Sequence, residues 1–277
     1  MRPKDLVMDL FGDYVRYMGG SIRLGQIVEL LALFDVEPTT TRVTLSRMRK
    51  DGWVAAERQG REMLYSATPK LLKVLDEGRE RIFSPSRSPW TGQWTMVLYQ
   101  IPETRRRQRE RLKRTLAWEG FGQLNSTTWV SPHSVREQMY ELLGCESDPT
   151  IHVVTMSTGS WARDKELAAQ CWDLEELAVA YRRFIEEWGA ELDAAAQQVS
   201  DEEAWRLRVK LVWDYRHFPF RDPNLPQGIQ PPDWPGDEAY TLFVREHQRL
   251  TAQANAHISA VVFGGGSGST GGFAGGV

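Results

Sequence analysis

The sequence is poor in the side chains that build most metal and redox sites. It has two cysteines, Cys145 and Cys171, and five scattered histidines, and none of them stands at metal-ligand spacing. We therefore expect two reduced structural or surface thiols, no metal and no cofactor. The phosphate-loop, dinucleotide-binding and nucleophile-elbow motifs are also missing, so the sequence favours a protein that is not an enzyme.

Long hydrophobic runs are missing as well. No stretch approaches the roughly 20 apolar residues of a membrane-spanning helix, and the start lacks the apolar centre of a secretion signal. Apolar residues still make up 41% of the chain and aromatic residues 10%, which is enough for sizeable cores. We expect a globular cytoplasmic protein, and 277 residues allow two or three domains.

Charge is spread unevenly along the chain. The formal net charge is −3, but residues 1–83 contribute +2, residues 84–143 contribute +4 and residues 144–277 contribute −9. The N-terminal part is therefore expected to face a polyanion, and the acidic C-terminal part to face away from it.

A helix followed by a basic hairpin is predicted between residues 39 and 65. Thr39 is expected to cap the helix, because its side-chain oxygen can accept from a free N–H of the first turn. Gly52 stands where a helix end favours left-handed backbone, and Gln59-Gly60 is the expected hairpin turn. Three residues at helical spacing would face a core: Thr41, Leu45 and Met48.

This order of elements is that of a winged helix-turn-helix, with a helix for the major groove and a wing for phosphate or the minor groove. Between residues 39 and 62 there are six basic and three acidic side chains, which suits phosphate neutralisation. The alternative is an ordinary solvated surface. The residues expected to bind DNA are Thr39, Thr40, Arg42, Ser46, Arg47, Arg49, Lys50, Arg58 and Arg61. Among them, Arg42, Ser46 and Arg47 are the expected base- or backbone-reading group.

Further apolar patterns complete the predicted N-terminal domain, residues 1–83. They indicate helices ending near Gly19-Gly20 and Asp35, and a helix from Pro69 to Phe83. Residues 84–92 are a linker by composition.

Residues 93–157 are predicted to form a ferredoxin-like domain. Strands are expected at 94–101, 121–130 and 151–156, with helices at 103–119 and 133–143 between them. This β-α-β-α-β order is one strand short of the complete fold. The first strand ends without an acidic residue, and the nearest one, Glu103, follows Pro102, so no metal-dependent nuclease site is expected.

The predicted helix 103–119 contains seven basic side chains. They are either a solvated face, a phosphate contact, or a site for an anionic effector or an acidic partner.

Residues 160–263 are predicted to be a helical domain. Helices are expected from Leu167 to Trp188, from Asp201 to Phe218 and from Asp237 to Phe263. Residues 264–277 are rich in glycine and are expected to be disordered.

Five stretches in this order resemble the PaaX-type repressors of phenylacetate catabolism. The stretches are LFGDYVRY (10–17), TRVTLSRMRKDGW (41–53), WTMVLYQIPETRR (94–106), CWDLEEL (171–177) and DYRHFPFRDPNLP (214–226). The resemblance implies an α+β protein with a winged helix-turn-helix, a ferredoxin-like middle domain akin to the CRISPR adaptation nuclease fold, and a helical C-terminal domain. It also implies a homodimer on double-stranded operator DNA, with residues 93–157 as the dimerisation domain.

The resemblance further implies a repressor that leaves its operator when an acyl-CoA such as phenylacetyl-CoA binds, with residues 160–263 as the effector-binding domain. A thioester of this kind needs basic groups for its phosphates and an aromatic slot for its acyl end. We expect Arg216, His217 and Trp234 to bind it, although the stretch 214–226 is equally compatible with a structural corner in which Asp222 caps a turn. The alternative function is a nucleic-acid-binding or protein-interaction scaffold without a small-molecule switch.

Overall fold

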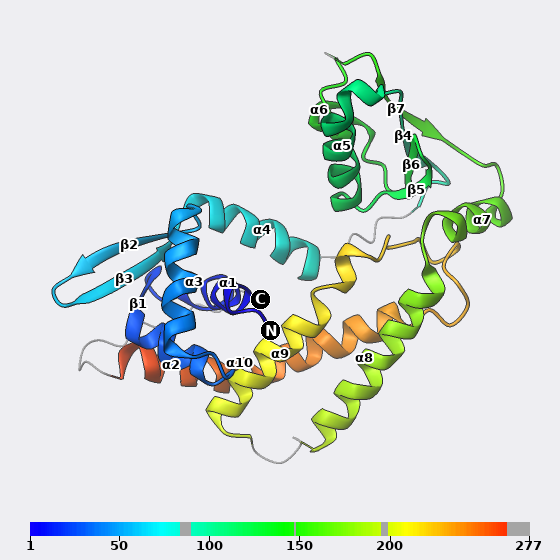
Figure 1. Cartoon of the computed structure of the whole chain (residues 1–277). Coiled ribbons are helices and arrows are strands. Elements are labelled where there is room, and N and C mark those ends of the chain that lie inside the picture. The colour runs from blue at the N-terminus through cyan, green and yellow to red at the C-terminus, as the bar shows by residue number, and fades with distance from the viewer. Residues whose placement is uncertain (84–89, 147, 195–198, 265–277) are drawn as a thin grey trace. The chain divides into compact units, whose positions relative to one another are not determined.

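The computed structural model describes residues 1–83, 90–146, 148–194 and 199–264 (Figure 1). By their contacts they form two compact units, each described separately below. Unit 1 contains Met1–Phe83, Glu187–Tyr215 and Thr241–Val277, and unit 2 contains Ser84–Glu186 and Arg216–Tyr240. Most of the predicted linker (84–89) and of the predicted tail (265–277) lies outside the described residues. The predicted domain boundaries remain predictions, because contacts do not test independent folding.

Unit 1 begins with helices and a small antiparallel sheet. The elements are α1 (Pro3–Asp13), η1 (Val15–Tyr17), β1 (Ser21–Arg23), α2 (Leu24–Ala32), α3 (Pro38–Lys50), β2 (Val54–Gln59), β3 (Glu62–Ala67) and α4 (Pro69–Phe83). The sheet has the order β1-β3-β2, and Gln59 pairs with Glu62 across the predicted hairpin. The turn is therefore Gly60-Arg61 and not Gln59-Gly60 as predicted, because Gln59 is the last residue of β2. Strand β1 was not predicted, because three residues are too few to show the alternation of apolar and polar residues that indicates a strand.

Helix α3 confirms the predicted core face and helix end but not the predicted cap. Thr39 lies inside the helix, which begins at Pro38 after Glu37 as the N-cap. Proline at the first position fixes a helical φ, so the helix starts one residue before the threonine. At the other end Gly52 has φ +73°, and the Trp53 N–H donates to the Met48 carbonyl at 2.8 Å. This is the glycine-terminated end expected. Thr41, Leu45 and Met48 are buried.

The core of unit 1 is built from both ends of the chain. Helices α9 (Asp201–Tyr215) and α10 (Gly236–Phe263) supply Trp205, Val209, Ala254 and Ile258 to the cluster formed by α1, α2, α3 and the sheet. The Gln26 amide on α2 donates to the carbonyls of Val261 and Val262 near the end of α10, at 3.2 and 2.8 Å. Residues after 200 therefore complete the hydrophobic core on which α3 packs.

A buried arginine joins α9 to the end of α1. The Arg208 guanidinium donates to the Tyr14 hydroxyl and lies 3.7 Å from the Asp13 carboxylate, and 6% of the residue is exposed. Burial raises the pKa of Tyr14 to about 12, although Arg208 acts against the rise. The tyrosine therefore stays a neutral hydroxyl that accepts from the cation.

Unit 2 contains a four-stranded antiparallel sheet in the order β5-β6-β4-β7. Its elements are β4 (Trp94–Tyr99), η2 (Glu103–Arg105), α5 (Arg106–Trp118), β5 (Gly122–Asn125), β6 (Thr128–Ser131), α6 (Arg136–Leu142) and β7 (Ile151–Met156). The order β-α-β-β-α-β is that of the ferredoxin-like fold. The single strand predicted at 121–130 was wrong. It is two strands around Ser126-Thr127, which supply the missing strand.

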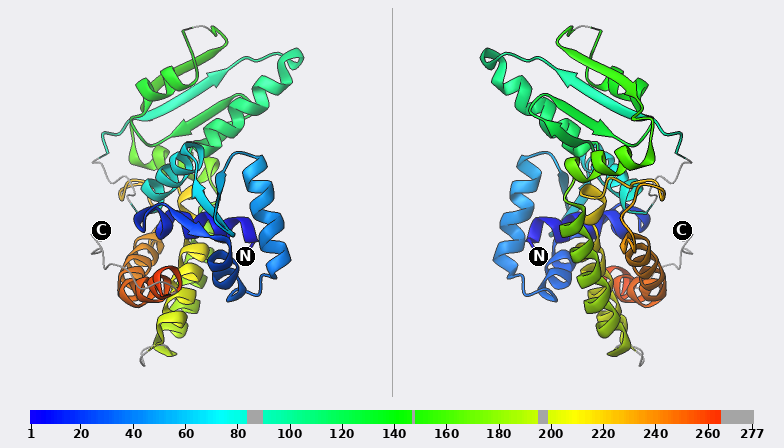
Figure 2. Two further views of the ribbon diagram at one scale, coloured as in Figure 1. Left: turned by 90° about the vertical axis from the view of Figure 1, so that its left-hand side faces the viewer. Right: turned by 90° about the vertical axis from the view of Figure 1, so that its right-hand side faces the viewer.

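Both faces of this sheet are covered. Val97 and Tyr99 of β4 pack with Leu112 and Leu116 of α5 on one face, whereas Trp94, of opposite parity, packs with Leu167 on the other face. Figure 2 shows α5 lying along its sheet.

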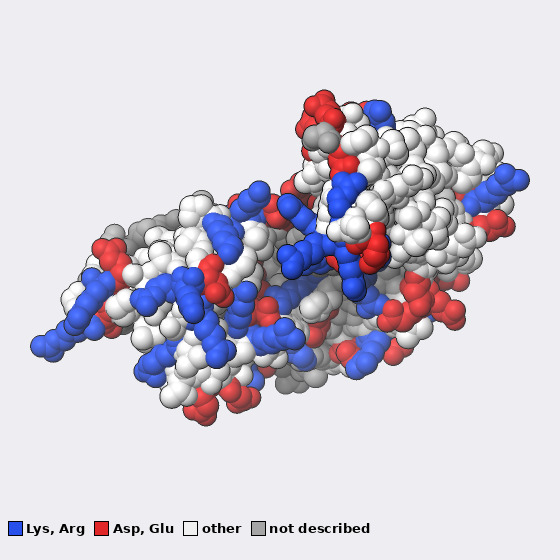
Figure 3. Space-filling model, turned by 45° about the horizontal axis from the view of Figure 1, so that its top comes forward, with Lys and Arg blue, Asp and Glu red and all other residues white. Residues whose placement is uncertain are grey.

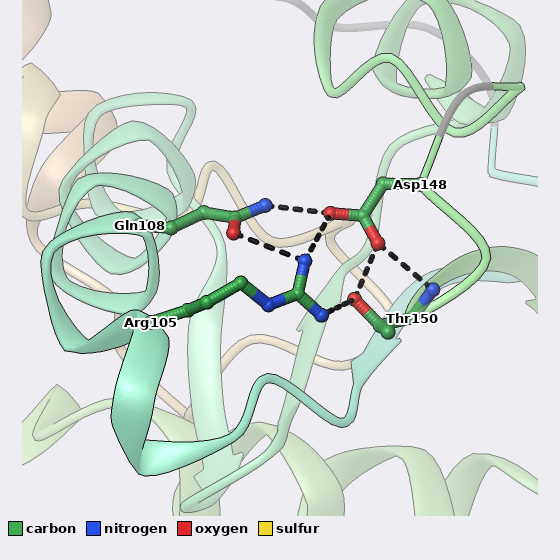
Figure 4. A network of polar contacts seen from close by, with 4 residues as sticks. All are labelled: Arg105, Gln108, Asp148 and Thr150. Carbon is green, nitrogen blue, oxygen red and sulfur yellow. Dashed lines mark hydrogen bonds and ion pairs between the residues drawn. The ribbon is translucent and has the colours of Figure 1, made fainter.

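A polar network fixes the start of α5 to the loop before β7 (Figure 4). Asp148 accepts from Gln108 at 2.6 Å, from Arg105 at 3.3 Å and from the Thr150 N–H at 3.0 Å. The Thr150 hydrogen bonds, followed by those from Gln108 and Arg105, lower the pKa of Asp148. The network therefore holds a carboxylate against the first turn of α5.

The remaining helices of the chain are α7 (Trp161–Cys171), α8 (Leu174–Ala194) and the single turn η3 (Phe218–Phe220). The helix predicted from Leu167 to Trp188 was wrong as one element, because the chain turns at Trp172-Asp173. The Asp173 carboxylate then accepts from the Glu176 N–H at 2.9 Å and starts α8. The helix predicted from Asp201 to Phe218 ends at Tyr215.

Candidate nucleic-acid interface

Helix α3 presents a polar and basic face to solvent. Its buried positions lie on one side, and the outward positions follow at intervals of three and four residues. All nine residues predicted to bind DNA are exposed: Thr39, Thr40, Arg42, Ser46, Arg47, Arg49 and Lys50 on α3, and Arg58 and Arg61 at the hairpin. Figure 2 shows α3 at the edge of unit 1, and Figure 3 shows many basic side chains on this unit.

The basic side chains of α3 are not neutralised internally. Within the described part of the chain, Arg42, Arg47, Arg49 and Lys50 form no ion pair. Their charges are therefore available to anions from solution. A cation without a protein partner can bind a phosphate without breaking an ion pair within the protein. Its binding also releases a counterion from the DNA.

The hairpin β2–β3 places two more cations at its tip. The Arg58 Nε donates to the Gly60 carbonyl at 3.2 Å, which holds the arginine along the turn, and Gly60 itself has φ +63°. Arg61 follows directly and is exposed. A glycine is required at the turn because a side chain is strained at this φ.

One residue of the α3 face was not predicted from sequence. Val43 is 49% exposed, and by helical geometry it lies between Thr39, Ser46 and Lys50 at the centre of the outward face. A β-branched apolar side chain in this position suits the methyl group of thymine. The sequence signal was an apolar residue out of phase with Thr41, Leu45 and Met48.

Unit 2 contains an open cleft of about 780 Å³ between the end of α7, the start of α8 and the loop 231–235. Trp172 and Trp234 line it together with Cys171, and Arg182 contributes the cation. Burial raises the pKa of the Cys171 thiol to about 11, which makes it a poor nucleophile. The cleft thus has two tryptophans, one exposed cation and two exposed carboxylates, Asp173 and Glu175.

The walls of this cleft are held in place. Trp172 stacks near Trp94, with ring centroids 6.4 Å apart, and Trp234 meets Tyr181 edge-on at 5.8 Å. A Cβ on Gly122 would come within 2.5 Å of the Trp172 ring, so only glycine allows the strand to approach this closely. The two tryptophans therefore require little reordering to receive a ligand.

The structure does not bring the whole predicted effector group to this cleft. Trp234 lines it, whereas Arg216 and His217, beyond the end of α9, do not. The stretch 214–226 has features of a corner, because Asp222 accepts from the Asn224 N–H at 2.7 Å and from the Tyr181 hydroxyl at 2.8 Å. The alternative of a structural corner therefore has direct support.

Glu103, the first carboxylate after β4 in the sequence, is paired with an arginine. It lies 2.7 Å from Arg109, and this contact lowers its pKa. Among the described residues there is no group of three or more His, Cys, Asp or Glu that could hold a metal ion. Nor does the described part of the chain contain a helix long and apolar enough to span a membrane.

Comparisons with known proteins agree on one family. Residues 2–71 match the model of PaaX-like proteins, residues 87–168 the central Cas2-like domain of PaaX proteins, and residues 172–260 the C-terminal domain of PaaX-like proteins. The transcriptional repressor PaaX of Escherichia coli is 28% identical over 92% of this chain and 82% of its own length. An uncharacterised protein from Mycobacterium tuberculosis shares the fold, with a TM-score of 0.64 at 20% identity over 92% of this chain and 98% of its own.

Three matched regions in this order define a regulator-type chain with a Cas2-like centre. The chain belongs to the PaaX family.

Proposed function

We propose that the protein is a DNA-binding transcriptional repressor of phenylacetate-type catabolic genes, and that unit 1 binds operator DNA as a winged helix-turn-helix. The observation that supports this best is the outward face of α3, which is exposed and free of ion pairs in the described residues. Helix α3 enters the major groove, with Arg42, Ser46 and Arg47 at the bases. Arg58 and Arg61 contact the backbone or the minor groove.

The relative from Escherichia coli is a transcriptional repressor, and it covers nearly the whole chain. We also propose a homodimer, because half-sites one helical turn apart need two copies of α3. The predicted residues Thr39, Thr40, Arg49 and Lys50 would then contact phosphates or bases in each half-site. Light scattering of the free protein measures the number of copies directly.

Replacing Arg42 and Arg47 with alanine is expected to weaken operator binding by about 100-fold or more. Each base-reading arginine contributes about 1–3 kcal/mol of discrimination, and the loss should be smaller on a random duplex. Fluorescence anisotropy at fixed salt, on DNA from upstream of the protein's own gene and on a random duplex, measures both.

The matched control is Lys73→Ala with Arg206→Ala, which removes the same charge from exposed positions of unit 1 off α3. This control should bind the operator nearly as wild type does. Equal losses in the two double variants would show that only net charge matters, and would contradict the assignment of α3 as the reading helix.

We further propose that an acyl-CoA of the phenylacetyl type binds the cleft of unit 2 and releases the repressor. Trp172 and Trp234 would enclose the aromatic acyl end, and Arg182 would meet the charged end of the ligand. Arg216 and His217, which were predicted from sequence, do not line the cleft and remain a separate candidate site to be tested.

Trp234→Ala is expected to raise the dissociation constant for phenylacetyl-CoA at least tenfold, because it removes one wall of the cleft. Calorimetric titration measures this, with free phenylacetate expected to bind poorly. Trp118→Ala, which removes an exposed tryptophan of the same unit outside the cleft, is the control. Unchanged affinity in Trp234→Ala together with a loss in Arg216→Ala would move the site to the group at residues 216–217.

A scaffold without a small-molecule switch is the alternative function. Operator affinity that no acyl-CoA alters would favour the scaffold, and would retain DNA binding by α3.

A further inference from the structure

Three arginines form a line on α5 of unit 2. Arg107, Arg111 and Arg114 follow each other by four and three residues, so they lie within one narrow strip of the helix surface. Leu112 and Leu116 on the same helix are buried against the sheet, and their positions place the arginine line directly opposite, toward solvent. All three arginines are exposed. We call this line the arginine stripe.

The neighbouring charges do not neutralise the stripe. Glu103 is paired with Arg109 at 2.7 Å, and the Glu110 carboxylate lies 3.8 Å from Lys113. Arg105 is occupied in the network with Asp148 (Figure 4). Arg105, Arg109 and Lys113 are therefore engaged within the protein, whereas the stripe is not.

Within the described residues the stripe has no ion pair of its own. Arg107 and Arg111 contact no carboxylate, and Arg114 donates only to the Glu110 backbone carbonyl at 3.2 Å. Like charges at this spacing destabilise a helix, so the arrangement contributes nothing to folding. An external anion would remove the repulsion.

The dimensions of the stripe fit a repeating anion. Arg107 and Arg114 are separated by a rise of about 10 Å along the helix, and one strand of B-DNA presents about three phosphates over that axial length. Arginine binds phosphate in a bidentate manner, which suits an ordered row of phosphates better than a diffuse acidic surface.

We propose that the arginine stripe is a second DNA contact, which binds the phosphate backbone of duplex DNA independently of sequence. It adds a region of DNA contact in unit 2 to the reading surface on α3, and it therefore rests on the proposed function. The stripe would supply affinity and salt dependence, and α3 would supply specificity.

The test is the salt dependence of binding to a random 40-base-pair duplex. The full-length triple variant Arg107→Gln, Arg111→Gln, Arg114→Gln should reduce the slope of log affinity against log salt by about 2 to 3, since each phosphate contact contributes about 0.9. Affinity at 0.15 M salt should fall on the order of 100-fold. The single variant Arg111→Gln should reduce the slope by about 0.9, and it keeps the test valid if the triple variant folds poorly.

The matched control is Arg136→Gln, Arg163→Gln, Lys165→Gln, which removes the same charge from exposed positions of unit 2 off α5. Its slope should stay near the wild-type value. If the stripe variants and the control change the slope equally, or if neither changes it, the stripe is a solvated face and the proposal is wrong. A changed oligomeric state with an unchanged slope would assign the stripe to a contact between copies, and would also overturn it.

Failure of this proposal can be told apart from failure of the proposed function. Suppose that the wild type binds operator, that substitution of Arg42 and Arg47 abolishes this binding, and that the stripe variants keep the wild-type salt slope. The proposed repressor function would then stand, and the second DNA contact would be wrong. A wild-type protein that binds no duplex at low salt overturns both proposals.

Discussion

Replacing Arg208 with methionine is expected to lower the free energy of unfolding by about 3 kcal/mol. Removing one partner of a buried charged contact leaves the others without compensation. Here those partners are the Tyr14 hydroxyl and the Asp13 carboxylate, and Arg208 itself is 6% exposed. Arg79, 4.0 Å from Asp13, still neutralises part of the Asp13 charge in the variant. The expected loss is therefore at the lower end of the range for breaking a buried ion pair. Urea denaturation measures the change.

Two further variants separate the causes. Tyr14→Phe removes only the hydroxyl and should cost about 1 kcal/mol. Arg206→Met, on the same helix but with an exposed pair to Glu203 at 3.6 Å, should cost less than about 0.5 kcal/mol. If Arg208→Met were as stable as wild type, the buried contact would not hold α9 to α1.

Lowering the pH from 7 to 5 is expected to remove about 2 kcal/mol of stability through His247 alone. Burial, followed by the nearby charges of Arg208 and Arg79, lowers the pKa of this histidine to about 3. The unfolded histidine titrates near its ordinary pKa of 6.5. Below that pH the unfolded state takes up a proton that the folded state does not, so stability is complete above about 6.5 and falls as the pH decreases toward 3.

The difference between wild type and His247→Phe isolates this contribution. The histidine ring lies 4.9 Å from Phe83 and 5.7 Å from Phe243, centroid to centroid, so an aromatic replacement keeps the contacts and removes the titration. His152→Gln, which removes a histidine from an exposed position of β7, is the control. A pH profile that His247→Phe does not flatten would mean that the histidine is protonated in the folded protein.

Local patterns predicted most of the elements, because they depend on neighbours in the sequence. The period of Thr41, Leu45 and Met48 gave the buried face of α3, and Gly52 gave its end. The hairpin β5–β6 was missed because Asn125 to Thr127 interrupts an otherwise continuous β-prone run only briefly. Three polar residues are enough for a turn, in which the Asn125 side chain accepts from the Thr127 N–H at 3.0 Å.

Contacts between segments that are far apart in the chain could not be predicted from a single sequence. Arg208 is charged, and charged residues are rarely fully buried, so its role between α9 and α1 could not be predicted. The contact between Trp205 and Phe34 could not be predicted either, because the two residues are far apart in the sequence. Their rings meet edge-on, with centroids 5.1 Å apart. Of the two candidate sites, the exposed face of α3 could be predicted from the helical spacing of its buried residues. The aromatic cleft depends on how loop 231–235 returns to α7.

The shared core of unit 1 limits how this protein can exchange parts with its relatives. The chain passes between the two units four times. A hybrid repressor that joins the first 83 residues of one relative to the rest of another would pair α3 with foreign versions of Trp205, Val209, Ala254 and Ile258. If α3 reads the operator as proposed, new operator specificity must therefore be transplanted on the surface of α3, or together with α9 and α10. Recombination at residue 83, whether in the laboratory or in a genome, would separate the two halves of this core.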